Sequence, residues 1–408
     1  MIARLAKTRT SRALVAVMSV FLGSILLTGC DTDGYPSDLV YPPRTDPLVI
    51  NRASRDAQGW DRPGEFPRVL FPELPAEDRE KLLGDPSKMK PEQRAELEKI
   101  LNDLFGTPAH PEVTGSGDAA EVVKALADSL RLDPTTLELG SSIYRAQCLH
   151  CHGLVGDGRG ATAPWVNPHP RDYRQGVFKF TSSKQDEGQR KPRKEDLIRT
   201  ITEGIEGSSM PSFRLLPDDQ IDALASYVIH LSLRGETEFY VIRSAIEDQL
   251  DLGVKAAVEE SLANFAGRWR DAQTSLIDPG PSPKTSEEEF KASALRGWDL
   301  FRKQGDAGCI SCHMDYGRQA AFKYDYWGTV VRPADVTTGI FRCGRRPIDL
   351  FWRIHSGING TGMTAFGKQT PEQQSGMSSA QIWDLVNFLE VLPYPAMRKA
   401  FGIKLEAD

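Results

Sequence analysis

The chain has 408 residues, of which 40% are hydrophobic and 26% are charged, and its formal net charge is −6. This length allows two or three domains, and this composition is that of an ordinary globular protein. The only long apolar run is N-terminal, which excludes a protein that crosses a membrane many times. The acidic balance and the lack of a basic tract argue against nucleic acid as a partner.

The first 29 residues are predicted to be a signal peptide. Residues 1–12 carry four basic and no acidic side chains, residues 13–27 are largely apolar, and small residues precede Cys30. This order of a charged region, an apolar region and a small-residue cleavage site is typical of export signals. Because removal takes four basic residues from a formal charge of −6, the mature chain would carry about −10.

Leu27-Thr28-Gly29-Cys30 resembles the lipobox of bacterial lipoproteins, so we expect Cys30 to carry the lipid anchor. The protein is then exported and tethered on the periplasmic side of a membrane. By analogy with enteric lipoproteins, Asp31 favours the inner membrane. The alternative is an uncleaved anchor, although fifteen apolar residues fall slightly short of the roughly 17–25 that span a bilayer.

Residues 30–132 are predicted to be a lipid-anchored spacer. The segment is rich in proline and charge, as in Tyr41-Pro42-Pro43-Arg44. We expect short helices at 91–104 and 118–130. The apolar content is too thin for an independent core, so we expect the spacer to be partly packed.

Two similar stretches follow and indicate a duplicated domain at 133–235 and 287–398. Cys148-Leu149-His150-Cys151-His152 recurs as Cys309-Ile310-Ser311-Cys312-His313. Further positions recur in the same order: Pro170, Asp172, Gly176, Phe178 and Lys179 as Pro333, Asp335, Gly339, Phe341 and Arg342; Gly204, Ile205, Gly207, Met210 and Phe213 as Gly357, Ile358, Gly360, Met363 and Phe366; Leu224 and Tyr227 as Leu385 and Phe388.

Residues 236–286 are predicted to connect the two halves. Apolar residues recur every three or four positions from Ile242 to Trp269, which indicates one face of a long helix. The prolines of 279–283 end this pattern before the second half begins.

Cys-x-x-Cys-His attaches haem c, because both thiols add to the porphyrin vinyl groups and the histidine binds the iron. The sequence therefore predicts two covalently bound haem c groups, held by Cys148, Cys151 and His152 and by Cys309, Cys312 and His313. A thioredoxin-like redox pair and a zinc site, including one Cys₄ site built from both pairs, are the alternatives. Export and the histidine that follows each pair favour haem.

Met210 and Met363 are the candidate iron ligands opposite the two histidines. They occupy equivalent repeat positions, and a thioether ligand raises the potential of a haem. Met377 is the second choice for the second haem, but it has no counterpart in the first half. His169, His230 and His355 have no histidine at the equivalent positions, so ligation by two histidines is the minority alternative.

Each half resembles a class I cytochrome c domain, and together they resemble exported dihaem cytochromes c. The resemblance covers about 133–233 and 287–392 and implies an all-α protein of two cytochrome c-like domains in tandem. It also implies that an N-terminal and a C-terminal helix cross in each domain. The residues that match this crossing are Gly140 and Tyr144 with Leu224 and Tyr227, and Gly297 and Phe301 with Leu385 and Phe388.

In that family a proline carbonyl orients the iron-binding imidazole, and Pro164 fits this role for His152. The second half has Asp325 at the equivalent position, so we expect a different acceptor for His313.

Three other residues are singled out. Arg171 and Arg174 could pair with haem propionates or lie on the surface. Cys343 has no partner and is expected to be a buried, inert thiol.

The leading hypothesis is an electron carrier that moves single electrons between respiratory partners, such as a quinol-oxidising complex and a terminal oxidase. No catalytic residue is predicted. The alternative is a haem enzyme, a dihaem peroxidase or a sulfur- or thiol-oxidising cytochrome, in which one haem is open to substrate. A free carrier and a fixed subunit of a membrane complex remain equally good interpretations.

Overall fold

The computed structural model describes residue 36 and residues 38–50, 75–184, 190–303, 308–342, 344–368 and 375–405. The chain divides into two compact units, Met1–Leu39 and Val40–Asp408, and the fold and the site below belong to the second. The predicted signal peptide, Cys30 and Cys343 lie outside the described residues. Within the described ranges, no helix has the length and hydropathy needed to cross a bilayer.

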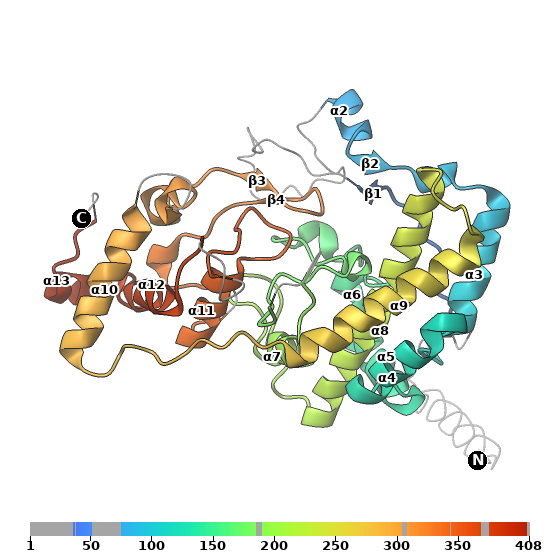
Figure 1. Cartoon of the computed structure of the whole chain (residues 1–408), viewed down its shortest axis with the longest axis horizontal. Coiled ribbons are helices and arrows are strands. Elements are labelled where there is room, and N and C mark those ends of the chain that lie inside the picture. The colour runs from blue at the N-terminus through green and yellow to red at the C-terminus, as the bar shows by residue number, and fades with distance from the viewer. Residues whose placement is uncertain are drawn as a thin grey trace, which may run out of the picture. The chain divides into compact units, whose positions relative to one another are not determined.

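The second unit is built of helices, which confirms the predicted all-α class (Figure 1). The strands among the described residues are two residues long and form two antiparallel pairs. They are β1 (Leu48–Val49) with β2 (Leu83–Gly84), and β3 (Lys323–Tyr324) with β4 (Val330–Val331). The second pair is a hairpin of the second half, with Lys323 opposite Val331.

The first half contains α5 (Pro134–Gln147), α6 (Leu149–His152), α7 (Lys194–Glu203) and the beginning of α8 (Asp218–Ile246). The Asp133 side chain caps α5 by accepting a hydrogen bond from Thr136 N at 3.0 Å. At the crossing of α5 and α8, a Cβ on Gly140 would lie 2.2 Å from the Ala223 carbonyl oxygen, so only glycine allows this approach.

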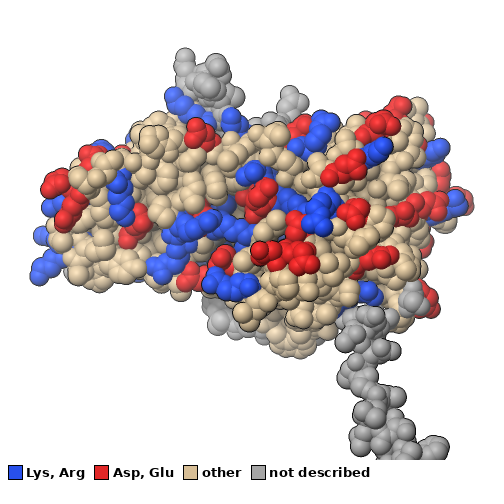
Figure 2. Space-filling view, turned by 90° about the horizontal axis from the view of Figure 1, so that it is seen from below, with Lys and Arg blue, Asp and Glu red and all other residues tan. Residues whose placement is uncertain are grey.

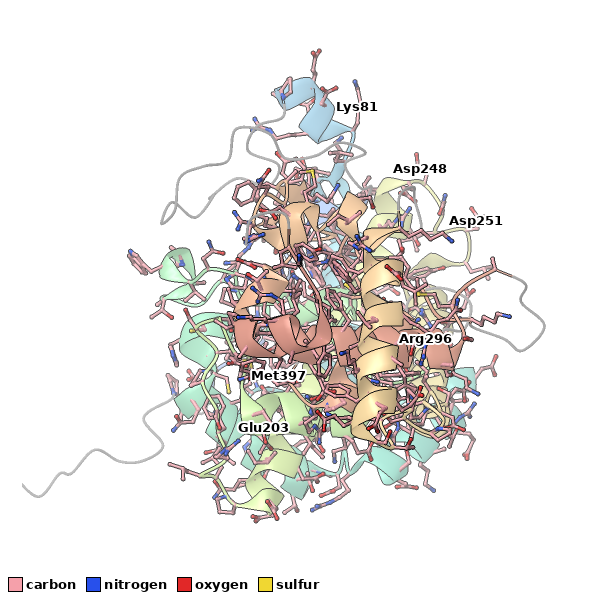
Figure 3. The ribbon with its side chains drawn as sticks, turned by 90° about the vertical axis from the view of Figure 1, so that its left-hand side faces the viewer. Lys81, Glu203, Asp248, Asp251, Arg296 and Met397 are labelled. Atoms are coloured by element: carbon pink, nitrogen blue, oxygen red, sulfur yellow. The ribbon has the colours of Figure 1, made fainter. Side chains whose placement is uncertain are left out.

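The second half repeats this arrangement with α10 (Glu287–Arg302), α11 (Pro347–Ser356), α12 (Ser379–Val391) and α13 (Pro395–Phe401). Where α10 crosses α12, a Cβ on Gly297 would lie 2.0 Å from the Asp384 carbonyl oxygen. Arg296, labelled on α10 in Figure 3, donates to the Asp384 carboxylate at 2.9 and 3.0 Å. The helix crossing that the resemblance implied is therefore present in both halves.

The segment before the first half contains α2 (Ala76–Glu80), α3 (Pro91–Phe105) and α4 (Ala120–Leu130). Its buried residues, among them Leu101, Phe105 and Leu126, belong to one hydrophobic core with Tyr144 and Tyr227 of the first half. The helices α3 and α4 pack against the connection between the halves. The segment has few apolar residues, but these are sufficient to fold it because they pack into the hydrophobic core of the first half.

The connection between the halves differs from the expected single helix. The apolar stretch from Ile242 to Trp269 is divided between α8 and α9 (Gly253–Thr274), which folds back against α8, α3 and α4. Asp248 has a left-handed φ of 54°, and it projects from the turn with Asp251 (Figure 3). The apolar period continues across the turn because both helices bury one face in the same core.

Candidate haem-binding site

A cavity of about 680 Å³ is lined by residues of both halves, within the size range of cofactor pockets. Each half contributes apolar side chains to it, such as Phe178 and Leu224 from the first and Phe341 and Leu385 from the second. All eight residues that the sequence assigns to iron or to haem attachment also line this cavity. They are Cys148, Cys151, His152, Met210, Cys309, Cys312, His313 and Met363.

One turn of chain positions each Cys-x-x-Cys-His motif. In the first half the motif follows α5 directly, and His152 N donates to the Cys148 carbonyl at 2.9 Å. In the second half His313 N donates to the Cys309 carbonyl at 2.8 Å. This helical turn brings positions i, i+3 and i+4 to one side, so both thiols and the imidazole face the cavity.

Both imidazoles are held in the form that binds a metal. His152 Nδ1 lies 3.3 Å from the Arg171 carbonyl oxygen, and His313 Nδ1 lies 3.0 Å from that of Ala334. A carbonyl oxygen can only accept, so Nδ1 carries the proton and Nε2 keeps its lone pair. Burial lowers the pKa of His152 to about 4 and also lowers the pKa of His313, so both rings are neutral at pH 7.

The acceptor expected for His152 was Pro164, and that prediction is wrong. The acceptor is Arg171, because the loop that supplies its carbonyl also stacks Tyr173 on the imidazole, with 4.9 Å between the ring centroids. For His313 we expected an acceptor other than the equivalent proline position, and that acceptor is the Ala334 carbonyl. Each acceptor directly follows a proline of the repeat, so the recurrence of that proline was the signal that could have identified both.

The cysteine pairs do not have the electrostatics of a redox couple. Burial raises the pKa of Cys148 to about 12 and that of Cys309 to about 11. Thioredoxin-like pairs require the opposite, a thiol whose pKa is lowered. Among the described residues, no three His, Cys, Asp or Glu side chains lie close enough to hold a metal ion, so the two pairs do not meet as a Cys₄ site.

Met210 and Met363 lie at the ends of two equivalent turns, one in each half. Ile205 N donates to the Met210 carbonyl at 3.1 Å, and Ile358 N donates to the Met363 carbonyl at 2.9 Å. Each methionine N–H donates to a hydroxyl two residues earlier, on Ser208 or Thr361, at 3.2 Å. The recurring sequence therefore forms a recurring structure that presents a thioether to the cavity.

The other candidate ligands are placed differently. Met377 packs against the core of the second half and does not line the cavity. The ring of His230 is buried away from the cavity and donates through Nε2 to the Phe105 carbonyl at 2.9 Å. His169 lines the cavity, whereas His355 does not. The described geometry thus favours the two equivalent methionines.

The two methionine turns meet the opposite halves reciprocally. A Cβ on Gly207 would lie 2.7 Å from Ile340 Cγ2 of the second half. A Cβ on Gly360 would lie 3.2 Å from Val177 Cγ1 of the first half. Gly207 is the repeat equivalent of Gly360, and Val177 is that of Ile340, so the halves contact each other through the same surface.

The cavity wall is rich in basic side chains. Acidic and basic side chains are interspersed over the face drawn in Figure 2, but the charged residues that line the cavity, among those that the structure describes, are all basic. They are Arg171, Lys179, Lys323, Arg332, Arg342 and Arg353. In a chain of net charge −6, such a wall is suited to a ligand with carboxylates.

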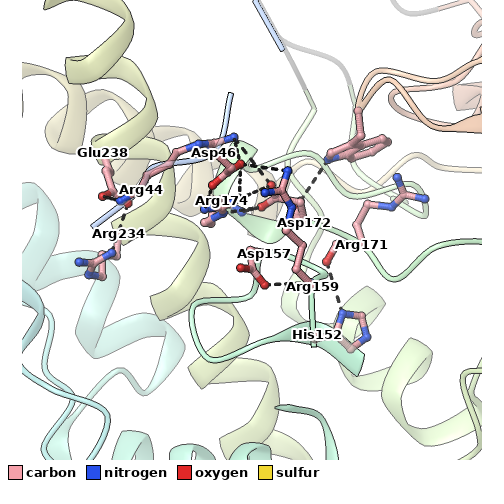
Figure 4. Close-up of polar contacts among 11 residues, drawn as sticks. Arg44, Asp46, His152, Asp157, Arg159, Arg171, Asp172, Arg174, Arg234 and Glu238 are labelled. Atoms are coloured by element: carbon pink, nitrogen blue, oxygen red, sulfur yellow. Dashed lines mark hydrogen bonds and ion pairs between the residues drawn. The ribbon is translucent and has the colours of Figure 1, made fainter. Parts of the chain in front are cut away.

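Of the two arginines singled out in the sequence, only Arg171 lines the cavity. Arg174 donates instead to Asp46 at 2.8 Å and to Asp172 at 2.9 Å (Figure 4). The remaining basic residues of the wall were missed. The recurrence of Lys179 as Arg342 in the repeat was the signal that could have found two of them.

Residues 135–228 match the family Cytochrome C oxidase, cbb3-type, subunit III. The first half is therefore similar to a cytochrome c domain. Such a domain implies covalently bound haem c and haem-based electron transfer. The match includes the first Cys-x-x-Cys-His motif and Met210, and it ends before the second half begins.

A chain of the Kuenenia stuttgartiensis reducing HAO-like protein complex is similar over 62% of this chain and 96% of its own, with a TM-score of 0.45 and 24% sequence identity. This likeness is too weak to bear on the function. No curated protein matches the chain in sequence.

The residues of the first half fit haem c. The thiols of Cys148 and Cys151, the free Nε2 of His152 and the thioether of Met210 border one apolar cavity. Basic side chains on its wall suit the propionate carboxylates. The second half presents the same donor set.

Proposed function

We propose that the chain is a dihaem c-type cytochrome that passes single electrons between redox proteins. The observation that carries this proposal is the duplicated donor set around one cavity: in each half a thiol pair, an imidazole with a free Nε2 and a methionine on equivalent turns. When bound, haem c supplies one-electron chemistry at iron.

The residues of the chain have distinct parts in this proposal. Cys148, Cys151, Cys309 and Cys312 attach the porphyrins. His152 and His313 bind through Nε2, while the carbonyl at Nδ1 fixes each ring and increases its basicity. Met210 and Met363, which border the same cavity, would supply the second ligand to each iron and would leave no position for substrate, which supports a carrier over an enzyme.

The cavity wall supports fairly high potentials in both halves. Thioether ligands favour reduced iron. Arg171 and Lys179 are paired with Asp325, but other basic side chains of the wall, such as Arg332 and Arg342, also disfavour an additional positive charge inside an apolar cavity, where electrostatic interactions are strong. Both effects stabilise the reduced state, as a donor to an oxidase requires.

We further propose that Cys30 is acylated and that the protein works on the periplasmic side of the membrane, tethered to it. The lipobox-like sequence supports this proposal. The matched family is named for an oxidase subunit, which supports a terminal oxidase or a quinol-oxidising complex as partner. Metabolic labelling with palmitate is expected to label the unaltered chain and not Cys30→Ala, and an unlabelled unaltered chain would contradict the lipid tether.

Redox titration of the full chain, matured in a host that attaches haem c, tests the function. We expect two haems per chain, a near-infrared band from sulfur on ferric iron in both, and no immediate binding of carbon monoxide to the reduced protein. A colourless protein, or free thiols at the four cysteines, would refute the proposal. Immediate binding of carbon monoxide at one haem would favour the enzyme alternative.

A further inference from the structure

The β3–β4 hairpin belongs to the second half and packs on the first. Its turn is fixed by Asp325 Oδ1, which accepts from Trp327 N at 3.1 Å and from the Thr329 N–H and hydroxyl at 3.0 and 2.8 Å. Tyr326 N donates to the Gly360 carbonyl at 2.7 Å, which ties the turn to the methionine loop of its own half. The hairpin is therefore a rigid projection of the second half.

Arg171 of the first half receives this projection. Its Nη1 lies 3.3 Å from Asp325 Oδ2, and the Asp325 side chain is fully buried. The guanidinium lies over the Trp327 ring, 3.7 Å from its centroid. Trp327 Nε1 also donates to the Asp172 carbonyl at 3.2 Å. The hairpin thus makes three contacts with the consecutive residues Arg171 and Asp172: a buried ion pair, a cation–π contact and a hydrogen bond to the backbone.

The main chain of Arg171 holds the first imidazole. Its carbonyl oxygen accepts the hydrogen bond from His152 Nδ1 (Figure 4). Three residues later, Arg174 is paired with Asp46 and Asp172. The loop 171–174 is therefore held by the hairpin at one end and by the N-terminal segment at the other.

Among the described residues of the second half, no equivalent contact is found. The acceptor for His313 is Ala334, whose methyl side chain can neither form an ion pair nor stack on an indole. His313 is thus oriented by its own half, whereas His152 is oriented by a loop that the other half holds.

We propose that Arg171 and the β3–β4 hairpin are positioning elements for His152, so that the second half sets the properties of the first haem. This rests on the proposed function, since His152 must bind haem iron. A firm hydrogen bond at Nδ1 makes the imidazole a stronger donor and favours ferric iron. Loosening the hairpin weakens that bond and raises the potential of the first haem more than that of the second.

Trp327→Leu in the haem-loaded full chain tests the proposal, because this substitution changes no charge. We expect the first haem to show a raised midpoint potential and altered electron paramagnetic resonance g values, which report the imidazole orientation. The second haem is expected to change less, because Trp327 contacts the methionine turn of its own half only at Gly360. Met210→His, which lowers the potential of the first haem, assigns the two potentials.

Two matched variants separate positioning from general damage. Trp327→Phe keeps a ring under Arg171 but loses the Nε1 hydrogen bond, so it is expected to give a smaller shift of the same sign. If Trp327→Leu does not fold, Trp327→Phe alone tests the positioning role. Trp165→Leu, at a tryptophan of the first half that is 79% exposed, is expected to change neither haem.

The outcomes separate this inference from the proposed function. Two haems with unchanged potentials and g values in both Trp327 variants would overturn the positioning role and leave the dihaem proposal intact. Fewer than two haems in the unaltered protein would refute the proposed function instead. Equal shifts at both haems would show a general electrostatic effect and would also overturn the positioning role.

Discussion

The two halves hold their histidines by the same backbone bond and differ in the side chains around it. His152 is bonded to the carbonyl of Arg171, and His313 to that of Ala334. Where the first half stacks Tyr173 on its imidazole, the second has Val336 at the equivalent position. The comparison teaches that the repeat preserves the backbone hydrogen bond of each histidine, while the side chains next to that bond differ between the halves.

Removing one thiol pair tests whether the halves are separate haem sites, and it has the largest expected effect. Cys148→Ala with Cys151→Ala is expected to reduce covalent haem from two per chain to one, because each porphyrin is attached by its own thiols. Cys309→Ala with Cys312→Ala is the matched variant. Mass spectrometry and the haem absorbance measure the count. Loss of both haems from either variant would show that the halves are not independent.

Exchanging the methionines tests whether the two haems have equivalent ligands. Met210→His and Met363→His are each expected to lower one potential by a sizeable part of the roughly 0.8 V that axial ligands span. Redox titration measures both potentials in each variant. Met377→His is the control and is expected to change neither, since Met377 does not line the cavity. A lowered potential in the control would assign the second ligand to Met377.

Adding a methyl group at the helix crossings compares the two cores. Gly140→Ala and Gly297→Ala place a Cβ 2.2 and 2.0 Å from a carbonyl oxygen of the facing helix. Each is expected to cost about 3 kcal/mol of unfolding free energy, at the upper end for overpacked sites. Denaturant titration measures the loss. Gly267→Ala on α9, where a Cβ meets nothing within 4 Å, is the control and should stabilise by up to about 1 kcal/mol.

Acid is expected to act on the two halves through different buried histidines, His230 in the first and His355 in the second, because burial lowers the pKa of each to about 4. The His230 side chain is fully buried, donates to the Phe105 carbonyl at 2.9 Å and stacks on Tyr227, whereas the equivalent residue of the second half is Val391. Burial lowers the pKa of His230 to about 4, below its usual 6.5. The unfolded chain therefore takes up a proton first as pH falls.

The stability that depends on neutral His230 is complete above pH 6.5 and is lost as pH falls through 4, by up to about 3 kcal/mol. Unfolding measured from pH 7.5 to 4.5 should show a shallower acid dependence in His230→Gln, which keeps a donor but does not titrate. His110→Gln, at an exposed histidine, is the control. An unchanged pH dependence in His230→Gln would show that another group controls the acid response.

Local patterns were sufficient to predict the helical class, and local patterns also led to the predictions of a duplication and of the site residues. Cys-x-x-Cys-His and the recurring methionine turn are short, and the backbone hydrogen bonds that form each of them span only a few residues. The glycines of the helix crossings were also identified from the sequence. Where two helix backbones approach closely, only glycine fits, so the position is visible as a recurring glycine.

Contacts between distant segments could not be predicted. Asp46 pairs with Arg174 across 128 residues, and Asp325 pairs with Arg171 across 154. Neither pair is indicated by a repeat or by a periodic pattern in the sequence. Asp325 was visible only as a departure from the repeat. The break at Asp248 was missed because both helices face one core, so the apolar period continues through a turn.

The reciprocal contacts of the methionine turns bear on the origin of the molecule. Gly207 approaches Ile340 as Gly360 approaches Val177, so one surface patch meets its own copy about an approximate two-fold axis. A homodimer of a single ancestral module would make this isologous contact before any fusion joined its subunits. The pairing of Arg171 with Asp325 departs from this symmetry, because the equivalents of the two residues in the opposite halves are Ala334 and Pro164. The halves therefore share one contact surface, and the ion pair crosses it in one direction only.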